Sequence, residues 1–151
     1  MRALGAKIGA LLIAGDVVVL DGPLGAGKTT FVQGLAEKLG VQGSVTSPTF
    51  VVSRIHKAKD GGLALVHVDA YRLSGPDDLV DLDLEATSNA AFVVEWGSPY
   101  VASFTDSWLE LRIDRSAELT DIDDASSGVR TVEITCVGPR WATVNFAGLA
   151  L

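Results

Sequence analysis

The hydrophobic residues of this chain form two kinds of pattern, nearly continuous runs and runs with a helical repeat. The continuous runs are rich in β-branched residues and lie at Val17–Leu20, Leu63–Val68 and Ala91–Val94. Such runs are typical of strands that are buried on both faces of a parallel sheet. Between residues 4 and 12, and again from Thr29 to Leu39, apolar residues recur every three to four positions. This spacing predicts two amphipathic helices, the second of which ends at Gly40.

Weaker patterns predict the other elements. A turn around Pro48 precedes a strand from about Phe50 to Ile55, and Lys57–Gly62 has the composition of a hairpin turn. The remaining expectations are a short acidic helix at Pro76–Leu82, strands at Trp108–Ile113 and Arg130–Val137, a solvated acidic loop between these strands, and a short strand or tail from Pro139. We see no repeat and no long linker, so we expect residues 1–151 to form one domain.

The amino-terminal segment allows two interpretations. Arg2 and Lys7 precede an apolar run at residues 8–14, as they would in a short signal peptide. Against this, Gly15 and a strand pattern follow at once, and the helical spacing favours an amphipathic helix that ends at Gly15. No run reaches the ~18 apolar residues of a membrane span. We therefore expect a cytoplasmic protein without membrane association.

Composition and charge narrow the class of protein. The chain has 151 residues, of which 48% are hydrophobic and 21% charged, which suits one globular core. Its net charge of −7 has the wrong sign for gripping nucleic acid alone, so we expect no stable DNA binding and contact with RNA only through a partner. Cys136 is the only cysteine, which excludes an intramolecular disulfide, and we expect it to be buried.

A glycine-rich segment, GPLGAGKTT, directly follows the first apolar run and precedes the second predicted helix. It fits the pattern G-x-x-x-x-G-K-[ST], in which glycines let successive backbone N–H groups face one phosphate at a helix N-terminus. Lys28 can reach the β- and γ-phosphates, and the Thr29 hydroxyl can ligate Mg²⁺. The predicted phosphate-contacting residues are Gly22, Pro23, Leu24, Gly25, Ala26, Gly27, Lys28, Thr29 and Thr30. This segment predicts a single-domain P-loop NTPase that binds a nucleotide with Mg²⁺.

Three apolar runs end in an acidic residue, at Asp21, Asp69 and Glu95. Carboxylates at the ends of parallel strands are what a P-loop enzyme needs beside Mg²⁺ and the attacking water. Asp21 precedes the loop itself, so we expect a local structural role for it. Of Asp69 and Glu95, one could hold Mg²⁺ and the other could orient or deprotonate water, and the spacing does not assign these roles.

Other polar and aromatic residues near these motifs are less specific. His67 lies inside a predicted strand, which favours a hydrogen-bonded core or edge histidine over a catalytic base. Arg72 could pair with an acid or reach a phosphate, and of these we favour the structural ion pair. Ser47 and Thr49 either sense the γ-phosphate or belong to an ordinary turn, and Trp96 is either a core residue or an exposed contact.

Taken together and in this order, GPLGAGKTT, SPTF, HVDAYRL and VEWG resemble the bacterial TsaE (YjeE) family, from about Ala3 to Val137. The resemblance implies an ATPase that works with two partners, TsaB and TsaD, in forming N6-threonylcarbamoyladenosine next to the anticodon of tRNA. It implies catalytic roles for Lys28, Asp69 and Glu95, Mg²⁺ ligation by Thr29 and Glu95, and a switch at Ser47–Thr49. It also implies nucleotide contacts from Asp69 and from an arginine in the late strands, for which Arg130 is the candidate.

The chain departs from the family pattern in two places. Family members usually have more residues before the first helix, including a threonine near the adenine, whereas Met1 stands at about that place here. Either the chain begins late or its adenine site is weaker. Asp83 stands where the family often has glycine, which would alter a helix end or a partner surface.

Two alternative functions use the same loop. A small-molecule kinase would transfer phosphate to an acceptor other than water, but such kinases usually carry an arginine-rich lid, and the arginines here are scattered. A nucleotide-gated interaction switch would use the same site for a conformation-dependent contact. The guanine-binding motif N-K-x-D is absent from the sequence, which weakens GTP as the nucleotide.

Overall fold

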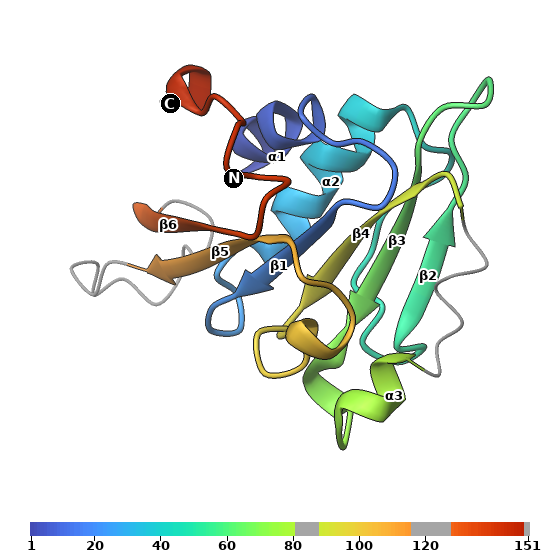
Figure 1. Cartoon of the computed structure of the whole chain (residues 1–151), viewed down its shortest axis with the longest axis vertical. Coiled ribbons are helices and arrows are strands. Elements are labelled where there is room, and N and C mark those ends of the chain that lie inside the picture. Colours follow the sequence, from blue (N-terminus) through green and yellow to red (C-terminus); the bar gives the residue numbers. More distant parts are fainter. Residues whose placement is uncertain (81–87, 116–127, 150–151) are drawn as a thin grey trace.

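The computed structural model describes residues 1–80, 88–115 and 128–149. In this part of the chain, six strands form one mixed sheet in the order β2-β3-β4-β1-β5-β6 (Figure 1). The strands are β1 (Val17–Asp21), β2 (Ser53–His56), β3 (Ala64–Asp69), β4 (Ala90–Glu95), β5 (Trp108–Arg115) and β6 (Arg130–Val137). The central four are parallel, and β2 and β6 pair antiparallel at the two edges. This confirms the predicted α/β fold with a mostly parallel sheet.

The helices of the described residues are short and lie on both faces of the sheet. They are α1 (Arg2–Gly9), α2 (Lys28–Leu39), α3 (Pro76–Val80) and the 3-10 segments η1 (Ala70–Arg72), η3 (Val101–Ser103) and η4 (Ala147–Leu149). The helix α2 ends at Gly40 in the left-handed conformation, φ 67°, as its sequence predicts. None of the described helices has the length and apolar character that crossing a membrane requires. The last two residues of the predicted acidic helix, the predicted acidic loop at 116–127 and Asp83 lie outside the described residues.

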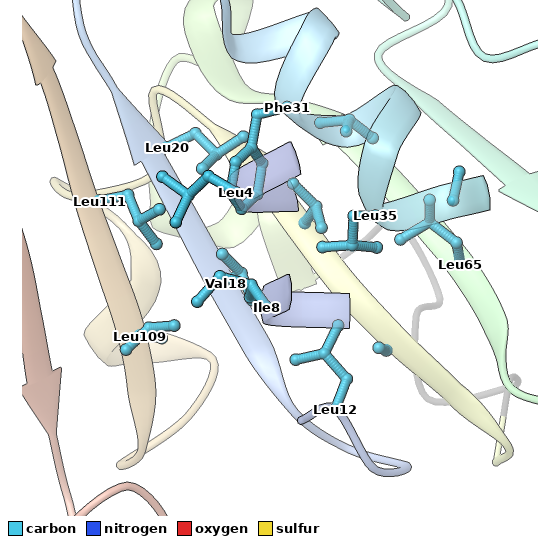
Figure 2. Packing of buried hydrophobic residues seen from close by; sticks show 14 of the residues in the cluster. Leu4, Ile8, Leu12, Val18, Leu20, Phe31, Leu35, Leu65, Leu109 and Leu111 are labelled. Atoms are coloured by element: carbon cyan, nitrogen blue, oxygen red, sulfur yellow. The ribbon is translucent and has the colours of Figure 1, made fainter. Parts of the chain in front are cut away.

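The two faces of the sheet carry separate hydrophobic clusters, which explains why the strand sequences are apolar at consecutive positions. Val18 and Leu20 of β1 point to the face that α1 and α2 cover, while Val17 and Val19 point to the other. Figure 2 shows the first cluster, in which Phe31 of α2 packs beside residues of α1 and β1. The second cluster is closed by short segments around η3. Both helices are thereby fixed against β1, and α2 begins where β1 ends.

The helices α1 and α2 approach each other so closely that two glycines are required at the contact. A Cβ on Gly5 would lie 2.0 Å from the carbonyl oxygen of Phe31, and a Cβ on Gly34 would lie 2.0 Å from that of Arg2. Both obstacles are backbone atoms, so no side-chain rotation relieves them. The position of α1 over α2 (Figure 1) therefore depends on these two glycines.

We expect Gly34→Ala to lower the free energy of unfolding by about 3 kcal/mol, because the two helices must separate to admit the methyl group. The gain in helix propensity from glycine to alanine, about 1 kcal/mol, is too small to offset this. Urea denaturation followed by circular dichroism measures the difference. Gly75→Ala is the matched control, since a Cβ there meets nothing within 4 Å. Equal stabilities of the two variants would contradict the close packing of α1 on α2.

The amino-terminal helix is confirmed but is shorter than predicted. It ends at Gly9, with Ala10 as its cap, rather than continuing to Gly15. Residues 10–16 instead form turns, in which the Ile13 N–H donates to Asp16. Leu12 is nevertheless buried in the same cluster as α1. The helical spacing thus identified the buried residues correctly although the backbone changes conformation after Gly9.

The strand predicted from Phe50 to Ile55 is wrong in its first half. Residues 50–52 form a turn, in which the N–H groups of Val51 and Val52 both donate to the carbonyl of Pro48. Phe50 is 87% exposed, and β2 begins only at Ser53. The hairpin turn predicted at 57–62 is confirmed, because β2 and β3 on its two sides pair antiparallel.

Cys136 is exposed, and the prediction that it is buried is wrong. It lies near the end of β6, an edge strand from which Val132 and Ile134 pack against the core while Cys136 faces solvent. The segment from Pro139 also differs from the short strand or tail that we expected. It contains turns and η4, it buries Trp141, and Arg140 donates to both carboxylate oxygens of Asp16 at 2.8 Å.

Candidate functional site

The glycine-rich loop joins the carboxyl end of β1 to the N-terminus of α2. Gly25 and Gly27 have φ angles of 76° and 105°, a region that L side chains rarely adopt. Gly22 is fixed by space as well, since a Cβ there would lie 2.3 Å from the carbonyl oxygen of Ile113 on the neighbouring strand. The helix α2 therefore begins with its free N–H groups at the loop, an arrangement that favours an anion.

The Lys28 side chain is folded against the loop. Its Nζ donates to the carbonyl oxygens of Gly22 at 2.6 Å and Pro23 at 3.1 Å, and it lies 4.0 Å from the centre of the Trp96 ring. Burial lowers the pKa of Lys28, while the nearby carboxylates of Glu95, Asp69 and Asp21 act in the opposite direction. The ammonium group is thus the positive charge at the centre of three acids.

The two strand-end acids that the sequence predicted lie directly opposite each other, because β3 and β4 pair in a register that places Asp69 beside Glu95. Both are buried. Asp69 accepts hydrogen bonds from the Thr49 hydroxyl at 2.7 Å and from the Tyr71 N–H at 3.0 Å. Glu95 Oε1 lies 2.8 Å from Nε2 of His67. Two buried carboxylates thus stand side by side at the carboxyl ends of β3 and β4, where a cation would balance their charge.

Asp21, the third strand-end acid, accepts a hydrogen bond from the Ser98 hydroxyl. This contact ties β1 to the segment after β4 and agrees with the structural role that we expected. Ser47 continues the polar contacts on the other side, since its hydroxyl lies 2.6 Å from that of Thr49. The residues 47 and 49 of the SPTF motif are therefore linked to Asp69 by a chain of hydrogen bonds.

A cleft of about 570 Å³ lies over these groups. Its described lining brings together most of the predicted site: Leu24, Gly25, Ala26, Gly27, Lys28, Thr29, Thr30, Ser47, Thr49, Asp69, Tyr71, Glu95 and Trp96. Gly22 and Pro23 contribute their carbonyls to Lys28 instead of lining the cleft. Arg130 lies against the loop, where its Nε donates to the Ala26 carbonyl at 3.2 Å.

The aromatic wall of the cleft was only partly anticipated. The sequence left open whether Trp96 is a core residue or an exposed contact. It lines the cleft, its φ is 60°, and its ring is tilted against that of Tyr71 with 5.4 Å between the ring centres. Tyr71 was missed, although it stands two residues after Asp69 in the DAYRL motif. Non-glycine residues with positive φ are concentrated at functional sites, where the surrounding structure holds the strain.

Two arginines lie differently from our expectations. Arg115 was missed: its Nη1 lies 3.6 Å from the point that a Cβ on Gly25 would occupy, and its register partner across β5 and β6 is Arg130. The strand pairing that joins them is the only indication the sequence could have offered. Arg72 lies over the Phe50 ring at 5.4 Å and makes no ion pair with any residue that the structure describes, so the predicted ion pair is wrong.

The side chains present suit Mg²⁺ better than a metal that needs a complete protein cage. Within residues 1–80, 88–115 and 128–149, no group of three or more His, Cys, Asp or Glu residues could hold a metal ion. Thr29, Asp69 and Glu95 all line the cleft and instead offer it a hydroxyl and one or two carboxylates. Mg²⁺ typically takes such a partial set and completes its coordination with phosphate oxygens and water.

The fold and the site together define a single-domain α/β protein in which a phosphate-loop motif, a buried lysine and two strand-end acids meet in one cleft. A family model described as "Threonylcarbamoyl adenosine biosynthesis protein TsaE" matches residues 1–122. This chain belongs to the TsaE family.

Individual relatives support the assignment over most of the chain. The tRNA threonylcarbamoyladenosine biosynthesis protein TsaE of Streptomyces coelicolor is 51% identical over 152 residues, which cover 99% of both chains. The protein of the same name from Bacillus subtilis is 37% identical over 127 residues, covering 84% of this chain and 73% of that one. The crystal structure of Bacillus subtilis YdiB superposes with a TM-score of 0.68 at 31% identity, covering 93% of this chain and 80% of that one.

Proposed function

We propose that this chain binds ATP with Mg²⁺ in the cleft and hydrolyses it as a subunit of a tRNA threonylcarbamoyladenosine biosynthesis system. The observation that carries the proposal is the meeting of Lys28, Asp69 and Glu95 with the phosphate-loop motif in one cleft of a TsaE-family chain. Partners similar to TsaB and TsaD would complete the system in the cytoplasm.

The loop and Lys28 would hold the phosphates. N–H groups at the start of α2 and in the loop donate to phosphate oxygens, and the Lys28 ammonium leaves the carbonyls of Gly22 and Pro23 for the β- and γ-phosphates. Burial makes this exchange favourable, because the ammonium is poorly solvated where it lies and gains a stronger anionic partner. Arg130, which already contacts Ala26, would add a positive charge on the outer side of the loop.

Thr29 and Glu95 would hold Mg²⁺, and Asp69 would help to orient the attacking water. When bound, the ion supplies positive charge to the β- and γ-phosphate oxygens. Each oxygen of Asp69 accepts one hydrogen bond from the protein, so each keeps a lone pair for a water molecule. Through Thr49, the same acid would couple the Ser47–Thr49 segment to the presence of the γ-phosphate.

The acidic surface supports a division of labour with the partners. At a net charge of −7 this chain repels the tRNA backbone, so the partners would hold the tRNA and carry out the transfer. The ATPase would then reset the assembly between turnovers rather than touch the modified base. Tyr71, which lines the cleft and is 68% exposed, would be accessible to a partner that senses the nucleotide.

Reconstitution tests the proposal. The purified chain is mixed with TsaB- and TsaD-like partners from the same organism, and modified tRNA is measured in ATP and in ADP. We expect Mg²⁺-dependent phosphate release that rises in the presence of the partners, and modification that stops after the first turnover when this chain is left out. Failure of the chain to bind ATP would overturn the proposal. Transfer of phosphate to a small acceptor by the chain alone would favour the kinase alternative.

A further inference from the structure

The His67 imidazole is buried behind the proposed metal ligand and has no part in the function proposed above. It is fully buried in β3, on the same sheet face as Leu65 and Asp69, and its Nε2 lies 2.8 Å from Glu95 Oε1. Its other ring nitrogen, Nδ1, is buried and has no hydrogen-bond partner within the described part of the chain. Within the described residues, the contact with Glu95 Oε1 is thus the one hydrogen bond of the His67 ring.

The surroundings determine which ring nitrogen carries the hydrogen. Oε1 of the Glu95 carboxylate is an acceptor, so the tautomer with its hydrogen on Nε2 makes the observed contact. A hydrogen on Nδ1 would find no acceptor among the described residues. The same holds for His56, which lies opposite Leu65 in the register of β2 and β3: its Nε2 is buried and has no hydrogen-bond partner among the described residues. His67 is therefore a fixed N–H donor to Glu95.

We propose that His67 is a positioning residue whose Nε2–H holds one oxygen of Glu95 and keeps the other available to the cleft for Mg²⁺. The inference rests on the function proposed above and adds to it a residue that touches neither nucleotide nor metal. Asp69 stands directly opposite Glu95, so the two carboxylates repel each other. A donor two residues before Asp69 on the same strand draws the Glu95 carboxylate toward a single orientation. Partners of this kind typically change metal affinity by about 10- to 100-fold.

The test compares two substitutions of His67 that differ in the donor. His67→Leu fills a similar space without a donor, whereas His67→Gln can place an amide N–H near the position of Nε2. Binding of a non-hydrolysable ATP analogue is measured by calorimetry with Mg²⁺ and with EDTA, together with ATP hydrolysis. We expect Mg²⁺ to raise the affinity of His67→Leu for the analogue about 10-fold less than it raises that of the original chain. The affinity of His67→Leu in EDTA should be unchanged. His67→Gln should stay within about threefold of the original chain in both.

His56→Leu is the matched control, since it also removes a buried imidazole from the same face, and His56 makes no hydrogen bond to an acid within the described part of the chain. It should leave the gain through Mg²⁺ unchanged. If the leucine variant does not fold, His67→Asn replaces it, because its shorter amide keeps the polarity but does not reach Oε1. Equal behaviour of the donor and non-donor variants would overturn the inference, as would an equal loss of affinity in EDTA. Absence of nucleotide binding by the original chain would instead overturn the proposed function.

Discussion

Lys28→Ala is expected to weaken binding of ATP by about 100-fold or more, corresponding to roughly 2.7 kcal/mol of binding free energy. Lys28 is surrounded by Asp21, Asp69 and Glu95, so its removal takes away the cation that faces the phosphates and leaves three carboxylates there. The triphosphate would then enter a site of like charge. Calorimetric titration with a non-hydrolysable ATP analogue in Mg²⁺ measures the loss.

The fold should tolerate this substitution, which separates a binding effect from an unfolding effect. Because burial lowers the pKa of Lys28, the folded state is less favourable to the charged ammonium than the unfolded chain is. The positive charge of Lys28 therefore adds no net stability to the fold that Lys28→Ala would remove. Lys38→Ala, on the exposed side of the same helix, is the control and should bind as the original chain does. Unchanged affinity in Lys28→Ala would exclude the phosphate-loop assignment.

The parts of the fold that depend on local pattern could be predicted from the sequence. The predicted bounds of β1, β3 and β4 agree with the structure to within about one residue. These strands are buried on both faces of the sheet, which makes their sequences apolar throughout. The loop and the acids were found for a related reason. A parallel sheet brings the carboxyl ends of its strands to one edge, so Asp69 and Glu95 had to lie near the end of β1.

The misses arise where distant segments or edge positions decide the outcome. Nothing in the local sequence of Trp141 indicates that the carboxyl-terminal segment returns to the core, held by Arg140 on Asp16. The strand predicted to begin at Phe50 begins later, because Pro48 starts a turn whose hydrogen bonds compete with strand pairing. Similarly, the contact of His67 with Glu95 depends on the register of β3 against β4, which no pattern along one strand reveals.

Glu95→Gln is expected to lower the rate of ATP hydrolysis by about 100-fold or more, and to lower the affinity gained through Mg²⁺ by at least the about 10-fold expected for His67→Leu. Glutamine keeps the shape of the side chain, and its carbonyl oxygen can still accept the hydrogen bond from His67. What is lost is the negative charge that would hold Mg²⁺ against the phosphates. Steady-state phosphate release and analogue binding, measured on the same preparation, separate the two effects.

In EDTA, we expect Glu95→Gln to bind the ATP analogue more tightly than the original chain does, although it hydrolyses ATP more slowly. Without Mg²⁺, Glu95 only repels the triphosphate, so removing its charge should tighten metal-free binding even as turnover falls. Lys28→Ala should weaken ATP binding both with Mg²⁺ and in EDTA. Glu95→Gln should weaken binding with Mg²⁺ but strengthen it in EDTA. Glu133→Gln, an exposed carboxylate on β6, removes the same charge far from the cleft and should change neither. If Glu95→Gln hydrolyses ATP as fast as the original chain, Glu95 does not take part in hydrolysis. The proposal that His67 positions Glu95 for Mg²⁺ would then fail as well.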